Sequence, residues 1–354
     1  MSPHAPPLRG SLPPEGADPA WGGPAPDRSP AAQALGPGCL ALDNAAELAR
    51  ISAWIPQVLT QKLRRRGLVV AISGGIDSSV CAALSVRAVG AKKVFGLLLP
   101  ERDSSGFSTE RGRLLAEHLG IEYQVHDIAP ALEALGCYQQ RDEAIRRVVP
   151  EYGEGWKNKI VIAGGVDGGG INFFKLVVQS PEGEQRSVRL PLREYLQIVA
   201  ATNFKQRVRK TMDYYHADRL NYAVVGTPNK LEYDQGFFVK NGDGSADLKP
   251  IAHLYKTQVY GMARHLGLPD DICSAVPTTD TYTLPQGQDE FYFALPYAQM
   301  DLALWAVENG RTAQELGTAL GISTEQAERV VADIGAKRRA TEYLGGAPEL
   351  MPKA

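Results

Sequence analysis

An apolar segment that leads directly into a turn rich in glycine and serine limits most strongly how this chain can fold. Residues 69–79 have the sequence Val-Val-Ala-Ile-Ser-Gly-Gly-Ile-Asp-Ser-Ser, and a helix-compatible stretch follows as far as Val89. This order predicts a strand, a tight turn and a helix start, an arrangement that binds phosphate groups at the helix N-terminus. Glycine lets backbone N–H groups approach an anion closely, and the hydroxyls of Ser73, Ser78 and Ser79 add donors. The segment contains neither the Gly-Lys-Ser/Thr of the common nucleotide P-loop nor the motif Gly-x-Gly-x-x-Gly. The alternative to a phosphate-binding turn is an ordinary αβ turn rich in glycine and serine.

Strands and helices alternate on both sides of this turn. The apolar segments predict strands, and the segments with helical spacing predict helices that connect them. This alternation indicates an α/β fold with a doubly wound, Rossmann-like parallel sheet flanked by helices, whose ligand lies beyond the carboxyl ends of the strands. The predicted strands are Leu68–Ile72, Lys93–Leu99, Glu122–Asp127 and Tyr222–Val225, and the predicted helices are Ala45–Leu63, Ser79–Val89, Thr109–Leu119, Tyr195–Ala217 and Lys256–Leu266.

Composition excludes several classes of protein. The 354 residues carry a net charge of −2, and no block of five like charges supports binding to a nucleic-acid backbone. No apolar run reaches the length of about 18 residues that crosses a membrane. The four cysteines are scattered and form no Cys-x-x-Cys pair, which argues against a zinc site and favours a reducing compartment. We therefore expect a cytoplasmic protein without a membrane or nucleic-acid partner.

The chain divides into three parts by composition. Residues 1–38 contain 10 of the 24 prolines and 6 glycines, so we expect a disordered tail. Residues 39–310 form the predicted α/β domain, interrupted at 150–191 by a glycine-rich loop (164–170) and a hairpin made of Phe173–Gln179 and Ser187–Leu190. We expect a polar loop over Gly226–Asp247 and helix over much of Asp289–Asn309. Residues 311–354 are predicted to form a small helical extension with helices at Ala313–Leu320 and Thr324–Arg339.

Three further blocks accompany the turn. They are residues 203–209 (Asn-Phe-Lys-Gln-Arg-Val-Arg) with Tyr214, residues 225–232 (Val-Gly-Thr-Pro-Asn-Lys-Leu-Glu) with 236–247, and residues 250–256 with 277–280. In order and spacing, the four blocks resemble the ammonia-dependent NAD synthetases, members of the ATP pyrophosphatase (PP-loop) superfamily. The resemblance covers roughly residues 40–309 outside the insertion. It implies an ATP-dependent amide ligase that adenylates the carboxylate of deamido-NAD and lets ammonia displace AMP.

The resemblance also implies roles for individual residues. Asp77 and Glu232 match magnesium ligands of the family, and carboxylate oxygens suit that ion. Asp77 and Lys256 are the candidate catalytic residues, Lys256 as a point charge for phosphate oxygens. Candidate ATP contacts are Ile72, Ser73, Gly74, Gly75, Asp77, Ser78, Ser79, Thr227, Lys256 and Thr278. Candidate contacts to deamido-NAD are Arg207, Lys240 and Asp247.

Simpler interpretations of these residues stay open. Asp77 would also serve as a helix cap, and Lys256 would otherwise be a surface lysine on a helix. Arg207 and Arg209 would equally suit a solvated helix face. Phe237 and Phe238 suit stacking on an aromatic ring or packing in the core.

The chain departs from the family pattern in two places. Thr227-Pro228-Asn229-Lys230-Leu231-Glu232 stands where the family commonly has Thr-Asp-His-Ala-Ala-Glu, and Ala336-Lys337-Arg338-Arg339 lacks the histidine of a His-Lys pair near the C-terminus. These departures and the insertion leave open a paralogous ligase for a different carboxylate or amine. A tRNA-modifying enzyme and a nucleotide-binding module without catalysis are further alternatives.

The resemblance bears on assembly and on the nitrogen source as well. The segment before Leu40 is too short and too rich in proline for the amidase domain of the glutamine-dependent members. Free ammonia or a separate ammonia donor is therefore expected. The family resemblance also implies a homodimer whose substrate sites use both subunits.

Overall fold

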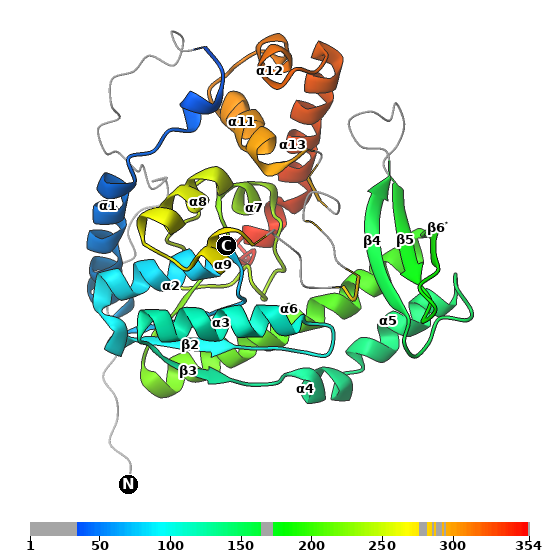
Figure 1. Cartoon of the computed structure of the whole chain (residues 1–354), viewed down its shortest axis with the longest axis horizontal. Helices are drawn as coiled ribbons and strands as arrows, with labels where there is room; N and C mark the ends of the chain where they lie inside the picture. Colours follow the sequence, from blue (N-terminus) through cyan, green and yellow to red (C-terminus); the bar gives the residue numbers. More distant parts are fainter. Residues whose placement is uncertain are drawn as a thin grey trace. The chain divides into compact units, whose positions relative to one another are not determined.

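Four parallel strands form the sheet that carries the glycine- and serine-rich turn (Figure 1). The computed structural model describes residues 34–163, 173–275, 282–284, 287, 292–293 and 295–352. The strand order is β3 (Glu122–Val125), β2 (Val94–Leu98), β1 (Leu68–Ala71) and β7 (Ala223–Val225). In the register of the central strand, Leu68 lies opposite Val94 on one side and Ala223 on the other. The predicted α/β class with a parallel sheet is confirmed.

Helices cover both faces of this sheet, which explains why β1, β2 and β7 are apolar, whereas the edge strand β3 alternates exposed polar and half-buried apolar residues. Leu68 and Val70 point into a core formed with α1 (Asn44–Gln57), α2 (Ile76–Val89), α3 (Gly106–Leu119) and α8 (Lys256–His265). Val69, between them, points to the opposite face and packs with α4 (Ala129–Ala134), α5 (Cys137–Arg146) and α6 (Leu192–Leu220). Alternate residues of one short strand therefore serve two separate cores.

Two boundaries differ from the sequence prediction in a way that matters for the site. Helix α2 begins at Ile76, three residues before the predicted start, with Gly75 in an extended conformation as its N-cap. Asp77 and Ser78 consequently lie in the first helical turn rather than in a loop. Helix α7 (Lys230–Gln235) lies inside the predicted loop 226–247, which corrects that prediction. Its six residues are too few to show a helical period, and a capping box between Asn229 and Glu232 starts it.

The inserted segment forms a second sheet of three antiparallel strands. These are β4 (Lys157–Ala163), β5 (Phe173–Gln179) and β6 (Gln185–Arg189). The predicted hairpin is present as β5 and β6, whereas β4 was not predicted because Lys157, Asn158 and Lys159 make its first half polar. Ile160, Leu176 and Val178 are buried against Ile198 of α6. The predicted glycine loop 164–170 lies outside the described residues.

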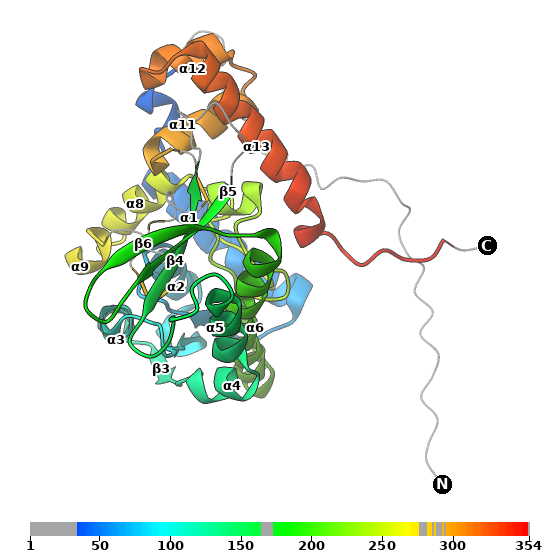
Figure 2. The same cartoon turned by 90° about the vertical axis from the view of Figure 1, so that its right-hand side faces the viewer.

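The helices at the C-terminal end form a core of their own with α7. Helices α11 (Tyr297–Glu308), α12 (Ala313–Leu320) and α13 (Thr324–Gly345) bury Leu316, Val330 and Ile334 around Leu231 of α7. Helix α13 continues six residues beyond the predicted end at Arg339 and is the long red helix of Figure 2. The division of the chain into a domain and an extension remains a prediction.

Short elements complete the described chain. They are the 3-10 turns η2 (Pro37–Leu40) and η4 (Ala91–Lys93), the π-helical turn η3 (Val58–Leu63) that prolongs α1, and α9 (Asp270–Cys273). Across the described residues, every helix is too short or too polar to cross a membrane.

Candidate active site

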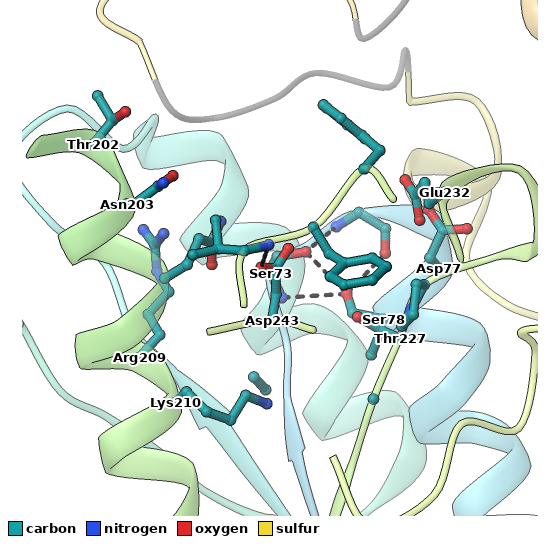
Figure 3. A pocket seen from close by; sticks show the side chains of 18 of the residues that line it. Ser73, Asp77, Ser78, Thr202, Asn203, Arg209, Lys210, Thr227, Glu232 and Asp243 are labelled. Atoms are coloured by element: carbon teal, nitrogen blue, oxygen red, sulfur yellow. Dashed lines mark hydrogen bonds between the residues drawn. The ribbon is translucent and has the colours of Figure 1, made fainter. Parts of the chain in front are cut away.

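A cavity of about 910 Å³ lies at the carboxyl ends of β1, β2 and β7. Its walls include residues 71–78 after β1, residues 97–100 after β2 and residues 225–228 after β7. Helix α6 supplies Asn203 and Arg209 from across the cavity, while Asp77 and Glu232 lie on the other side (Figure 3). Arg207 of the same helix also lines the cavity. Polar groups from segments far apart in the sequence therefore converge on one space.

The turn after β1 has a shape that requires glycine at position 74. Gly74 has a φ of 77°, and a Cβ atom there would lie 2.3 Å from the carbonyl oxygen of Ser108. Inside the turn, the Ser73 N–H donates to Ser78 Oγ over 3.2 Å, and the hydroxyls of Ser78 and Ser79 donate to the carbonyl of Gly75 over 3.0 and 2.8 Å. These bonds lie within the turn, and residues 73–78 of the turn line the cavity.

The structure brings most of the predicted ATP contacts to the cavity. Lining residues among them are Ile72, Ser73, Gly74, Gly75, Asp77, Ser78, Thr227 and Lys256. Ser79 is completely buried, its hydroxyl is used within the turn, and it does not line the cavity. Thr278 lies outside the described residues.

A buried ion pair joins the turn to α8. The Lys256 ammonium contacts Asp77 Oδ2, and only 1% of the Lys256 side chain is exposed. Burial alone would lower the pKa of Lys256, but the nearby carboxylates of Asp77 and Glu232 outweigh it and raise that pKa. Lys256 therefore stays positively charged, as a partner for anionic oxygens must.

Glu232 completes an acidic pair with Asp77. Burial, followed by the negative charge of Asp77, raises the pKa of Glu232 to about 8. No group of three or more His, Cys, Asp or Glu within the described part of the chain is arranged to hold a metal. Magnesium, however, is commonly held by one or two carboxylates together with substrate phosphates. Asp77 and Glu232, which lie beside the glycine- and serine-rich turn after β1, fit that requirement.

The predicted contacts to the dinucleotide fall into two groups. Arg207 and Lys240 line the cavity, where Arg207 Nε donates to the Lys240 carbonyl over 3.3 Å. Lys240 Nζ donates to the Tyr343 carbonyl over 2.6 Å and so ties the loop after α7 to the end of α13. Asp247 is exposed and does not line the cavity. Its carboxylate accepts the Val224 N–H over 2.7 Å and the Tyr214 hydroxyl over 3.4 Å.

Helix α13 contributes cavity residues that sequence reasoning did not assign. Lys337 lines the cavity and donates to Asp333 Oδ2 over 2.6 Å, and burial lowers its pKa. The sequence signal for Lys337 is the segment 336–339, which keeps a lysine but lacks the histidine of the family's His-Lys pair. Helix α13 also packs closely against the residue after α7, because a Cβ atom added at Gly236 would lie 2.2 Å from the Thr341 side chain.

Aromatic side chains line another part of the cavity. Phe174 of β5 stacks on Tyr195 of α6 with ring centres 3.9 Å apart and an interplanar angle of 12°. The inserted sheet therefore contributes to the cavity wall. Phe237 also lines the cavity and packs on Tyr292 at 4.6 Å, so it takes part in the C-terminal core as well.

The parallel sheet and the glycine- and serine-rich turn after β1 together define an α/β protein of the PP-loop class. A family model described as NAD synthase matches residues 47–151 and 183–340. The NH(3)-dependent NAD(+) synthetase of Rhizobium meliloti (strain 1021) is 60% identical over 312 residues, which cover 88% of this chain and 93% of that protein. The chain belongs to the NAD synthase family, and it is accordingly a ligase that forms C–N bonds.

Solved structures show the same fold at low sequence identity. An NMN synthetase from Francisella tularensis is 21% identical with a TM-score of 0.61, covering 89% of this chain and all of that one. An NH3-dependent NAD synthetase from Campylobacter jejuni subsp. jejuni NCTC 11168 is 21% identical with a TM-score of 0.59, covering 88% of this chain and all of that one. The segment between the two parts matched by the family model contains β4 and β5.

Proposed function

We propose that the protein makes NAD⁺ from deamido-NAD, ATP and ammonia, with release of AMP and pyrophosphate. The observation that carries the proposal is the 60% identity to the Rhizobium meliloti enzyme across 93% of that enzyme's length. The cavity supports it, because a phosphate-shaped turn, a buried lysine and two acids line one side and cationic residues of α6 line the other.

The reaction has two steps. A carboxylate oxygen of deamido-NAD attacks the α-phosphorus of ATP, and the bond to the β-phosphate oxygen breaks to release pyrophosphate. Ammonia then attacks the carbonyl carbon of the adenylate, AMP leaves with the electrons of the C–O bond, and a proton is lost to give the amide. Adenylation is needed because a free carboxylate has no adequate leaving group.

The residues of the turn would act in the first step. We assign the turn of residues 73–78, which opens α2, to the β- and γ-phosphates and Lys256 to the charge that develops on the departing pyrophosphate. Asp77 and Glu232 would hold Mg²⁺, which supplies charge neutralisation at the phosphates when it is bound. Thr227 and Ile72 would contact the nucleotide from the neighbouring strand ends.

The second substrate would lie between α6 and the loop after α7. Arg207 and Lys240 present cationic groups there to the phosphates of deamido-NAD. The family resemblance suggests a homodimer, and the exposed position of Asp247 suits contact with a dinucleotide held between two copies of the chain. The scattered cysteines support a cytoplasmic location. Free ammonia, or ammonia from a separate donor, is the proposed source of nitrogen.

A substrate panel tests the proposal. The purified protein is incubated with ATP, Mg²⁺, ammonium chloride and one carboxylic acid at a time, and AMP, pyrophosphate and NAD⁺ are quantified. NAD⁺ is expected only with deamido-NAD, and Asp77→Asn is the inactive control. Rapid AMP release with another acid and none with deamido-NAD would instead favour the paralogous ligase.

A further inference from the structure

Asn229 connects the two acids of the site. It lies between the end of β7 and the start of α7, and it is completely buried. Its side-chain Nδ2 donates to Asp77 Oδ1 over 3.1 Å, across 152 positions of sequence. Its Oδ1 accepts the Glu232 N–H over 3.1 Å, and its own N–H donates to Glu232 Oε2 over 3.1 Å. One side chain thus contacts the carboxylate of Asp77 and the residue that carries the other carboxylate.

The chemistry of the amide suits this position. A carboxamide has a donor at one end and an acceptor at the other, so it can serve a carboxylate and a helix N-terminus at the same time. It is also neutral, and therefore it adds no third negative charge beside Asp77 and Glu232. Lys256 contacts Oδ2 of Asp77 while Asn229 contacts Oδ1, so both oxygens of that carboxylate are held in place.

We propose that Asn229 is a positioning residue that fixes the carboxylates of Asp77 and Glu232 in the arrangement that binds a divalent cation. The inference rests on the proposed role of these two acids as metal ligands. Groups that orient metal ligands by hydrogen bonds typically contribute 10- to 100-fold to metal affinity. Asn229 would act in this way while also capping α7, and the two roles can be separated by substitution.

Asn229→Ser and Asn229→Thr separate the roles. Serine and threonine are good N-cap residues, so both variants keep the acceptor for the Glu232 N–H. Their side chains are too short to reach Asp77 as well. The matched control is Thr312→Ala, which removes the acceptor from the capping box of α12, a helix that does not line the cavity. This control loses a helix cap and leaves the acidic pair untouched.

The probe is Mn²⁺, titrated by electron paramagnetic resonance in the presence of α,β-methylene-ATP, with Asp77→Asn as the background. Thermal unfolding of each variant is measured in parallel without metal. Both Asn229 variants are expected to bind Mn²⁺ 10- to 100-fold more weakly while unfolding within about 3 °C of the unsubstituted protein. Thr312→Ala is expected to lower the unfolding temperature by about 1 to 3 °C and to leave Mn²⁺ affinity unchanged.

Steady-state pyrophosphate release adds a second readout. Rising Mg²⁺ concentration should restore much of the rate of Asn229→Ser, because a positioning residue changes ligand geometry and leaves the ligands present. Mn²⁺ affinity within twofold of the unsubstituted protein in both Asn229 variants would overturn the inference, and so would the absence of a Mn²⁺ site that depends on Asp77. The pyrophosphate assay contains deamido-NAD, whereas the Mn²⁺ titration does not, so a failure of the proposed substrate assignment would abolish the first readout and leave the second unchanged.

Discussion

Substitution of Gly74 tests directly why the turn after β1 requires glycine at this position. In Gly74→Ala, the new Cβ would lie 2.3 Å from the carbonyl oxygen of Ser108, and the φ of 77° is unfavourable for any side chain. Left-handed backbone costs alanine about 1 to 2 kcal/mol, and forcing an extra carbon into a packed position costs about 1 to 3 kcal/mol more. The variant should therefore lose about 2 to 5 kcal/mol of unfolding free energy.

Two other glycines serve as controls for this substitution. Gly120 has a φ of 62°, and a Cβ added there would meet nothing within 4 Å, so Gly120→Ala should show the backbone cost alone. Gly75 has a φ of −85°, and its Cβ would lie 3.3 Å from Ser73 Oγ. Gly75→Ala should therefore stay within about 1 kcal/mol of the unsubstituted protein. Because its methyl group would enter the turn that we propose binds phosphate, it should slow pyrophosphate release at least about 10-fold.

Urea unfolding followed by circular dichroism at one protein concentration measures these differences. The clash is isolated as the unfolding free energy of Gly120→Ala minus that of Gly74→Ala. A difference below about 0.5 kcal/mol would refute the argument that the Ser108 carbonyl excludes a side chain at position 74. Full pyrophosphate release by Gly75→Ala would refute the assignment of the turn to phosphate.

Three further predictions concern the rest of the site and its support. Lys256→Met should lower the rate of pyrophosphate release at least about 100-fold in stopped-flow assays, because it removes the buried charge beside Asp77, and a rate within 3-fold would contradict that role. Phe174→Ala should raise the KM for deamido-NAD several-fold with little change in the KM for ATP if the inserted sheet contacts the dinucleotide; equal effects on both would count against this. Burial raises the pKa of Glu47, but hydrogen bonds from His253 and Arg50 outweigh it and lower the pKa to about 2. The contribution of Glu47 to the unfolding free energy is therefore present above about pH 4.5 and is lost as the pH falls toward 2. At pH 5.5 the unsubstituted protein should be more stable than Glu47→Gln by about 1 to 2 kcal/mol, after allowing for solvent screening. In thermal unfolding this difference should vanish near pH 2.

Local features of the fold could be predicted from the sequence with good accuracy. The hydrogen bonds inside the turn after β1 join residues no more than five positions apart, such as Ser73 and Ser78, although the Ser108 carbonyl that excludes a side chain at position 74 is distant in the sequence. Strands β1, β2 and β7 are apolar on both faces, so their composition alone marks them, and the edge strand β3 is marked by its alternation of polar and apolar residues. Strand β4 was not predicted because its first residues are polar. Helix α7 was not predicted because six residues are too few to show a helical period.

The sequence by itself determined the class of fold, the phosphate-shaped turn and the family, because each depends on neighbouring residues or on blocks in a fixed order. Only the tertiary structure decided which side chains meet. Lys256 reaches Asp77 across 179 positions, and Asn229 reaches it across 152. Lys337 and Phe174 enter the cavity because a C-terminal helix and an inserted sheet pack against it, whereas Asp247 stays outside. Such contacts depend on how whole elements pack, and no local pattern records that packing.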